Sequence, residues 1–236
     1  MPISPDITFT WLGHGTWSVV SATGKKVLID PWVMGNPACP EGLKQIDELD
    51  LMLITHGHFD HIADAVEIAK RTSPQIVGIV ELTSWLAAKG VTGASDHAMN
   101  KGGTVVVEGI SVTMVHAEHS CGITDNGQVI YGGEAVGYVI EFENGYTIYF
   151  SGDTDVFGDM ALIGRLHRLD SVFLPIGGHY TMDVRRAAHA VELLGARVVV
   201  PMHYNTFPLL SANAADLAEQ LGNRARVVSC APGQTL

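Results

Sequence analysis

Four side chains of the types that bind metal ions lie within six residues of one another. They are His56, His58, Asp60 and His61. The first two follow a predicted strand and are two residues apart, so both rings can point the same way. Neutral imidazole and carboxylate groups bind Zn²⁺, and also Mn²⁺, Fe²⁺ or Ni²⁺. A histidine-rich surface turn is the alternative, but this pattern is far more specific than a lone histidine.

Further candidate ligands lie in loops that follow predicted strands. Asp153 comes after Gly152, a residue that lets the backbone turn sharply. The alternative role for this carboxylate is an Asx turn or a helix cap. His203 follows a β-branched strand, where a lone histidine is usually an ordinary surface residue. Another strand is followed by two competing histidines, His116 and His119.

Two more histidines, His14 and His179, lie in glycine-bearing loops after predicted strands. Such a side chain can support a ligand, contact substrate or protonate a leaving group, whereas its alternative role is to cap the loop. We predict a functional role for both, because polar residues in loops at strand ends often carry function. The remaining histidines are expected to be structural or solvated: His97, His116, His167 and His189.

The hydrophobic pattern predicts strands alternating with helices, with the candidate ligands at strand ends. Two β-rich runs flank a turn at 21–24, and Asn144-Gly145 is a strong hairpin signal. The other predicted strands are 51–55, 75–80, 105–107, 111–117, 136–143, 146–150, 171–176, 198–201 and 225–230, and the predicted helices are 62–69, 83–89, 160–169, 184–194 and 212–221.

Two similar halves emerge from this order, each with sheet first and then helix and strand. That arrangement favours an α/β fold, a four-layer αββα sandwich with helices outside two packed sheets. The 236 residues contain no linker rich in proline, serine or charge and no short-period repeat. We therefore predict a single domain over 1–236.

Composition and net charge limit the kinds of partner that this protein can bind. The net charge is −11 and there is no long run of Lys or Arg, which argues against nucleic acid. Three cysteines without C-x-x-C spacing predict neither a disulfide framework nor a thiolate zinc site. The first residues lack signal-peptide features and no apolar stretch approaches bilayer length, so we expect a cytoplasmic protein with no membrane partner. The oligomeric state stays open, with a homo-oligomer among the options.

The motif Thr55-His56-Gly57-His58-Phe59-Asp60-His61 resembles the signature of the metallo-β-lactamase superfamily, and the similarity covers nearly the whole chain. Of the two competing histidines, His119 matches this family better than His116, because the loop Ser120-Cys121-Gly122 follows it directly. The resemblance implies an αββα sandwich and two divalent cations, Zn²⁺ by preference. It implies one metal on His56, His58 and His119, a second on Asp60, His61 and His203, and Asp153 as the bridge. Such metals, roughly 3.5–4 Å apart, lower the pKa of a shared water.

Within this superfamily, segments 11–14, 174–177 and 201–208 are most similar to metal-dependent hydrolases related to ascorbate-6-phosphate lactonase. This branch implies that a bridging hydroxide attacks a small-molecule ester, lactone or phosphoester. We take Asp60, His14 and His179 as the candidate catalytic residues. His179 stands where many relatives carry an acid. Two alternatives remain: a phosphodiesterase for a nucleotide or lipid head group, and a non-catalytic metal-binding module.

Overall fold

The apolar runs of the first half form a six-stranded sheet. The computed structural model describes residues 3–236. The strands β1 to β3 are antiparallel, and β3 to β6 are parallel. In sheet order they are β1 (Thr8–Gly13), β2 (Thr16–Val20), β3 (Lys26–Ile29), β4 (Leu51–Leu53), β5 (Gln75–Ile79) and β6 (His97–Met99). Because β3 and β4 run in parallel, the residues that follow them emerge at one edge of the sheet.

A seven-stranded sheet forms the second half. Its order is β15-β14-β13-β12-β11-β8-β7, with antiparallel pairing from β7 to β12 and parallel pairing from β12 to β15. The loops after β12 and β14 therefore leave this sheet at the same edge. The strands are β7 (Thr104–Val107), β8 (Ile110–His116), β11 (Val136–Glu141), β12 (Thr147–Phe150), β13 (Ser171–Pro175), β14 (Val198–Met202) and β15 (Arg226–Val227).

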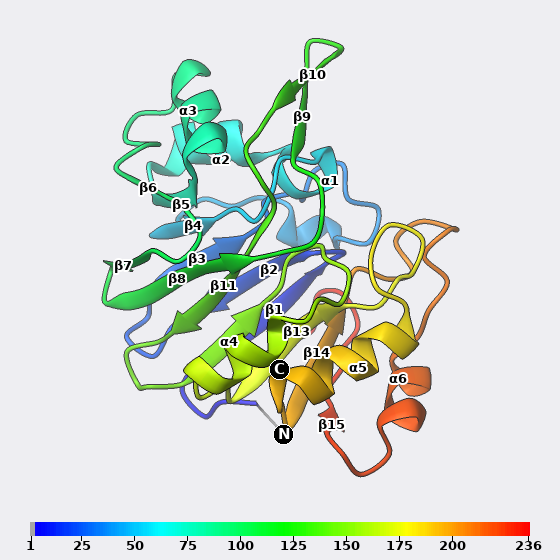
Figure 1. Ribbon diagram of the computed structural model, residues 1–236. Helices are drawn as coiled ribbons and strands as arrows, with labels where there is room; N and C mark the ends of the chain where they lie inside the picture. The colour runs from blue at the N-terminus through cyan, green and yellow to red at the C-terminus, as the bar shows by residue number, and fades with distance from the viewer. Residues whose placement is uncertain (1–2) are drawn as a thin grey trace.

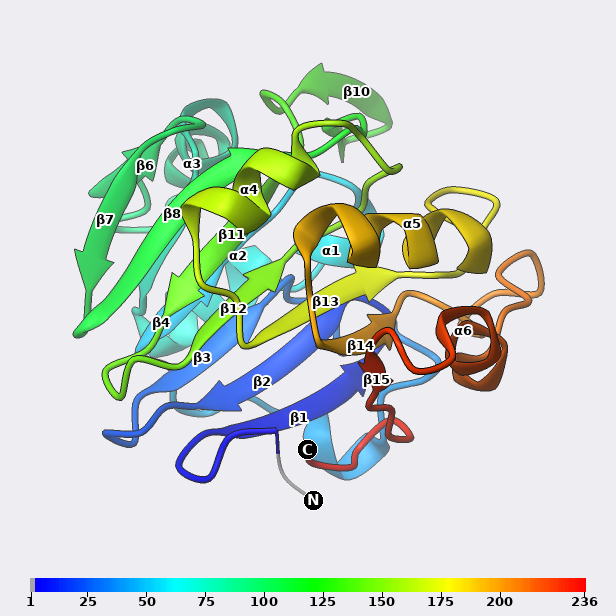
Figure 2. The same ribbon diagram turned by 60° about the horizontal axis from the view of Figure 1, so that its bottom comes forward.

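Helices cover the outer faces of the two large sheets. Figure 1 shows α2 and α3 on one side and α4, α5 and α6 on the other, and Figure 2 shows α4 and α5 in front of the second sheet. The arrangement is the predicted four-layer αββα sandwich. The helices are η1 (Glu41–Leu43), α1 (Phe59–Ile62), α2 (Ala65–Thr72), α3 (Val80–Ala88), α4 (Met160–Leu166), α5 (Val184–Leu194) and α6 (Ala214–Leu221).

Two apolar clusters hold these layers together. The larger one fills the space between the sheets, where Phe9 of β1 packs against Phe173 of β13 with ring centroids 5.4 Å apart. The smaller one lies between the second sheet and α4 to α6, and includes Tyr149, Val191 and Leu217. Burial of these faces supplies the main driving force for the layered packing.

The structure adds a hairpin that was not predicted, β9 (Gly122–Asp125) with β10 (Gln128–Tyr131), which projects from the body in Figure 1. Its turn holds Asn126 at φ 49° and Gly127 at φ 78°, the left-handed conformations that an Asn-Gly hairpin turn requires. Strand β6 was also not predicted. The last predicted strand, 225–230, is shorter than expected, because only Arg226–Val227 pair with β14.

Candidate metal centre

The candidate ligands meet where the strand ends of the two sheets face each other. The motif 55–61 follows β4 and enters α1, and the other side chains come from loops after β8, β12 and β14. The position between the first two histidines of the motif, Gly57, has no room for a side chain, because a Cβ there would come within 2.5 Å of Ile123 Cγ1. Its N–H donates to Cys121 Sγ at 3.2 Å, which ties the motif to the second half of the chain.

His56, His58 and His119 form the first group of ligand-type atoms. His56 Nε2 lies 3.0 Å from His58 Nδ1, and His119 Nε2 lies 3.2 Å from the same atom. Burial lowers the pKa of all three imidazoles, which favours the neutral form that binds cations. The outer nitrogen of His58 faces Ser120 Oγ at 3.2 Å. That contact leaves Nδ1 of His58 free for a metal.

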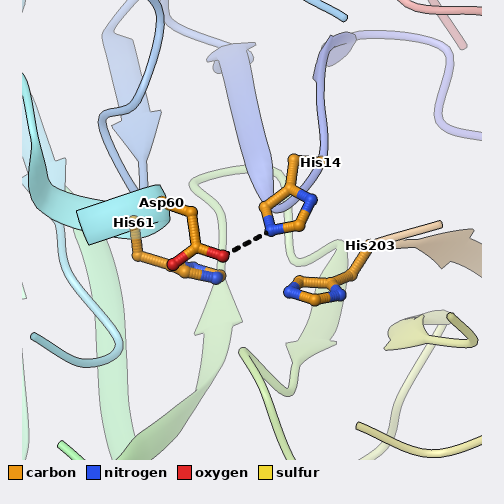
Figure 3. Close-up of side chains that lie close together, drawn as sticks. All are labelled: His14, Asp60, His61 and His203. Carbon is orange, nitrogen blue, oxygen red and sulfur yellow. Dashed lines mark hydrogen bonds and ion pairs between the residues drawn. The ribbon is translucent and has the colours of Figure 1, made fainter. Parts of the chain in front are cut away.

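The second group contains His14, Asp60, His61 and His203, whose ligand-type atoms lie within 4.8 Å of one another. Figure 3 shows these four side chains around one point, with Asp60 hydrogen-bonded to His14. Burial alone would raise the pKa of Asp60, but the hydrogen bond from His14 and the nearby His61 hold it at about 2. Asp60 is therefore a carboxylate at neutral pH.

Asp153 lies between the two groups. Its Oδ2 is 2.9 Å from His203 Nε2, 3.4 Å from His61 Nε2, 3.7 Å from His119 Nε2 and 3.9 Å from His56 Nε2. Burial would raise the pKa of this carboxyl group, yet His203 and His61 hold it well below its usual value. One buried carboxylate thus faces histidines from both groups, as expected of a bridging ligand.

Asp30, which the sequence analysis did not single out, orients ligands of both groups. Its Oδ2 lies 2.8 Å from His61 Nδ1 and accepts from Thr55 Oγ1 at 2.7 Å. Because that hydroxyl donates to Asp30, it accepts from His56 Nδ1 at 3.0 Å. These contacts occupy the Nδ1 atoms of His56 and His61 and turn Nε2 of both rings toward Asp153. The signal for this residue was its position directly after β3, beside β4.

The residues present fit bound cations. Among residues 3–236, three buried atoms of this centre have no hydrogen-bond partner, namely His61 Nε2, Asp153 Oδ1 and His203 Nδ1, and His203 Nε2 faces only the Asp153 carboxylate at 2.9 Å. Buried polar atoms without partners are costly unless water or an ion satisfies them. In the first group, three imidazole lone pairs converge, which a cation between them would stabilise.

The family comparisons agree with this chemistry. Residues 25–204 match the model of the beta-lactamase superfamily domain. The chain belongs to the beta-lactamase superfamily. It is 56% identical to a UPF0173 metal-dependent hydrolase of Koribacter versatilis, over 97% of each chain, and 51% identical to one of Solibacter usitatus, over 95% of this chain and 97% of that one. Igni18, a metallo hydrolase of Ignicoccus hospitalis, is similar in structure with a TM-score of 0.85 at 35% identity, over 98% of this chain and 97% of that one.

The protein is therefore a metal-dependent hydrolase of this superfamily. The seven side chains predicted as ligands are brought together by its fold, whereas His116 lies outside the cluster, with Nε2 3.3 Å from Glu118. The described residues include no helix long and apolar enough to cross a membrane.

In this hydrolase His14 supports Asp60. Nε2 of His14 lies 2.9 Å from Asp60 Oδ2, and Nδ1 lies 2.9 Å from Thr206 Oγ1. Because the carboxylate only accepts, the ring donates through Nε2 and accepts the Thr206 hydroxyl proton. Both nitrogens are thus engaged, which favours a positioning role over metal binding.

His179 is separated from this cluster. It lines a shallow pocket with Gly178 and Asp183, and its ring packs edge-to-face against Tyr180 at a centroid distance of 4.5 Å. Tyr180, which was not predicted, lines the cavity over the metal centre instead.

Because His14 is buried, we expect acid to destabilise the metal-free protein. Burial, and then the charge of His203, lower its pKa to about 4 from 6.5. Because the unfolded state takes up the proton first, stability falls as the pH drops from 6.5 to 4. We expect the titration of His14 to lower the free energy of unfolding by about 2 kcal/mol as the pH falls from 7.5 to 5. Asp153 and Asp30 raise the pKa of His61 against the effect of burial. Its contribution to the free energy of unfolding is therefore already complete below pH 6.5.

Urea unfolding of the metal-free wild type and His14→Gln at pH 7.5 and 5 measures this loss. We expect the variant to lose about 2 kcal/mol less than the wild type over this interval. An equal loss in both proteins would contradict the assignment.

Proposed function

We propose that this hydrolase binds two divalent cations, Zn²⁺ by preference, and cleaves a small ester, lactone or phosphoester. His56, His58 and His119 would hold one cation, and Asp60, His61 and His203 the second. The observation that carries this proposal is the position of Asp153, whose Oδ2 lies within 3.9 Å of a nitrogen of His56, His61, His119 and His203.

When bound, such a metal pair lowers the pKa of a shared water and polarises a substrate carbonyl or phosphoryl oxygen. The chain's own residues supply the rest. Asp60 is ionised at neutral pH and would serve as a carboxylate ligand, while His14, itself bound to Thr206, donates to Asp60 and keeps that group oriented. His179 contributes through Tyr180, which it contacts at the cavity wall.

Turnover by the metal-loaded protein tests the proposal. Protein reconstituted with Zn²⁺ or Mn²⁺ should bind about two equivalents. It should cleave p-nitrophenyl acetate, a simple lactone or bis-p-nitrophenyl phosphate. Asp60→Ala should lose more than about 100-fold in kcat/KM, since loss of a ligand exceeds the 10–100-fold effect of an outer partner.

Glu67→Ala is the matched control, because Glu67 is an exposed carboxylate on α2 outside the cluster. Its kcat/KM should equal that of the wild type. Less than about one equivalent of metal after reconstitution would overturn the two-metal proposal. Two equivalents without turnover of any substrate in the panel would overturn the proposed substrates.

A further inference from the structure

The metal centre opens into a cavity of about 710 Å³, which suits a small molecule. Its floor contains His58, His119, Asp60 and Asp153. Its apolar walls come from three separate segments, the start of α1, the loop after β13 and the loop after β14, and Ser120 and Thr124 add polar wall from the segment after β8.

The rim of this cavity is apolar and unusually exposed. Phe59, Tyr180 and Leu209 each leave more than half of their surface open to solvent, at 59%, 53% and 55%. Three large apolar side chains from distant parts of the sequence therefore gather around one opening. Such a cluster at a concave site marks a surface that a ligand covers.

One side of the rim is supported by a buried tryptophan. Trp32 is 3% exposed and contacts Phe59 edge-to-face at 5.8 Å and Phe207 face-to-face at 5.9 Å between ring centroids. A turn positions Leu209, because the Leu210 N–H donates to the Phe207 carbonyl at 2.9 Å. The apolar wall is thus held in place without a ligand.

Tyr180 lies in a hydrogen-bonded loop. The loop is closed by the Gly178 N–H, which donates to the Met182 carbonyl at 2.9 Å, and the Met182 N–H in turn donates to the Thr154 carbonyl at 3.1 Å. The His179 ring packs edge-to-face against the tyrosine ring. The backbone of this wall is therefore fixed by its own hydrogen bonds.

Charge sets a second condition on the ligand. Among the residues that the structure describes, none of those lining this cavity is Lys or Arg. The ionisable groups there, His58, His119, Asp60 and Asp153, belong to the metal centre, and the wall adds only the hydroxyls of Ser120, Thr124 and Tyr180. Proteins that bind phosphate groups typically provide Arg or Lys donors for them.

We infer that the cavity takes an uncharged ester or lactone with an apolar acyl chain, and that Phe207 and Leu209 select for that chain. The inference rests on the proposed function and narrows its substrate class. The metal centre holds the reacting carbonyl, and the chain lies along the rim formed by Phe59, Tyr180, Phe207 and Leu209. Anionic phosphoesters find no side-chain cation to pair with.

A chain-length series tests this inference. The Zn²⁺-loaded enzyme is assayed with p-nitrophenyl acetate, butyrate and hexanoate, and with bis-p-nitrophenyl phosphate. Full burial of one methylene corresponds to about a fourfold gain, so kcat/KM should rise more than about tenfold from acetate to hexanoate. The phosphodiester should be the poorest substrate.

Leu209→Ser should remove most of this rise, so that hexanoate loses more than acetate. Leu166→Ser is the matched control, because Leu166 is an exposed leucine at the end of α4, outside this cavity. It should keep the wild-type series. Binding adds a readout without turnover: calorimetry should find hexanoate, a product of the series, bound at least about tenfold more tightly than acetate.

The outcomes separate the two proposals. Cleavage of esters with no dependence on chain length, or a preference for the phosphodiester, would overturn the inference and leave the proposed hydrolase standing. An unchanged chain-length series in Leu209→Ser would overturn the role of this rim residue. Absence of turnover together with equal binding of acetate and hexanoate would overturn both.

Discussion

Asp153→Ala is expected to lose more than about 10³-fold in kcat/KM, a larger effect than the 10–100-fold of an outer-shell change. The reason is the position of its carboxylate, which faces both histidine groups at once. Without it, neither proposed cation keeps its shared ligand. Metal analysis after dialysis should find less than one equivalent bound, and steady-state kinetics should show the loss in kcat.

Asp159→Ala is the control for this variant. Asp159 is an exposed aspartate six residues later, and its side chain makes no capping hydrogen bond to α4. Its metal content and kinetics should match the wild type. Two tightly bound equivalents in Asp153→Ala would show that this carboxylate does not bridge the metals.

Much of the fold could be predicted because burial determines both the apolar pattern of the sequence and the packing of the strands. The fully buried strand β4 is a continuous apolar run, and the equally buried β12 is apolar or aromatic after Thr147. The turn at Asn144-Gly145 carries its own chemical signal. The Asn-Gly pair at 126–127 carries the same signal, but the two strands beside it are only four residues long and β10 is mostly exposed, and their hairpin was missed. The single domain stays a prediction.

The candidate ligands could be located for a different reason. In the second sheet β12, β13 and β14 run in parallel, so the residues after β12 and β14 emerge at one edge, and the packing of the two sheets brings the motif after β4 to the same place. The residues around them were not predictable in this way. Tyr180 and Phe207 carry no chemical signature, and only their placement around one opening shows their role. His179 had such a signature, yet Tyr180, the next residue, lines the cavity in its place.

Substitution of Asp30 is the second change from which we expect a large effect, here on metal affinity. Asp30→Asn keeps the shape of the side chain and tolerates the left-handed backbone at φ 51°. The amide, however, cannot accept from the Thr55 N–H, the Thr55 hydroxyl and His61 together, because one of its two ends is a donor. Metal affinity should fall about 10–100-fold, measured by competition with a chromophoric chelator.

The same change should lower the stability of the metal-free protein by about 1–3 kcal/mol, since a buried donor loses its acceptor. Asp64→Ala separates the two effects. Asp64 accepts from the N–H groups of Val33 and Met34, at 2.6 and 2.9 Å, and contacts no ligand histidine. This control should therefore lose stability while keeping its metal affinity. If both variants bound metal equally well, Asp30 would support the fold alone, and the ligand histidines would be oriented by packing.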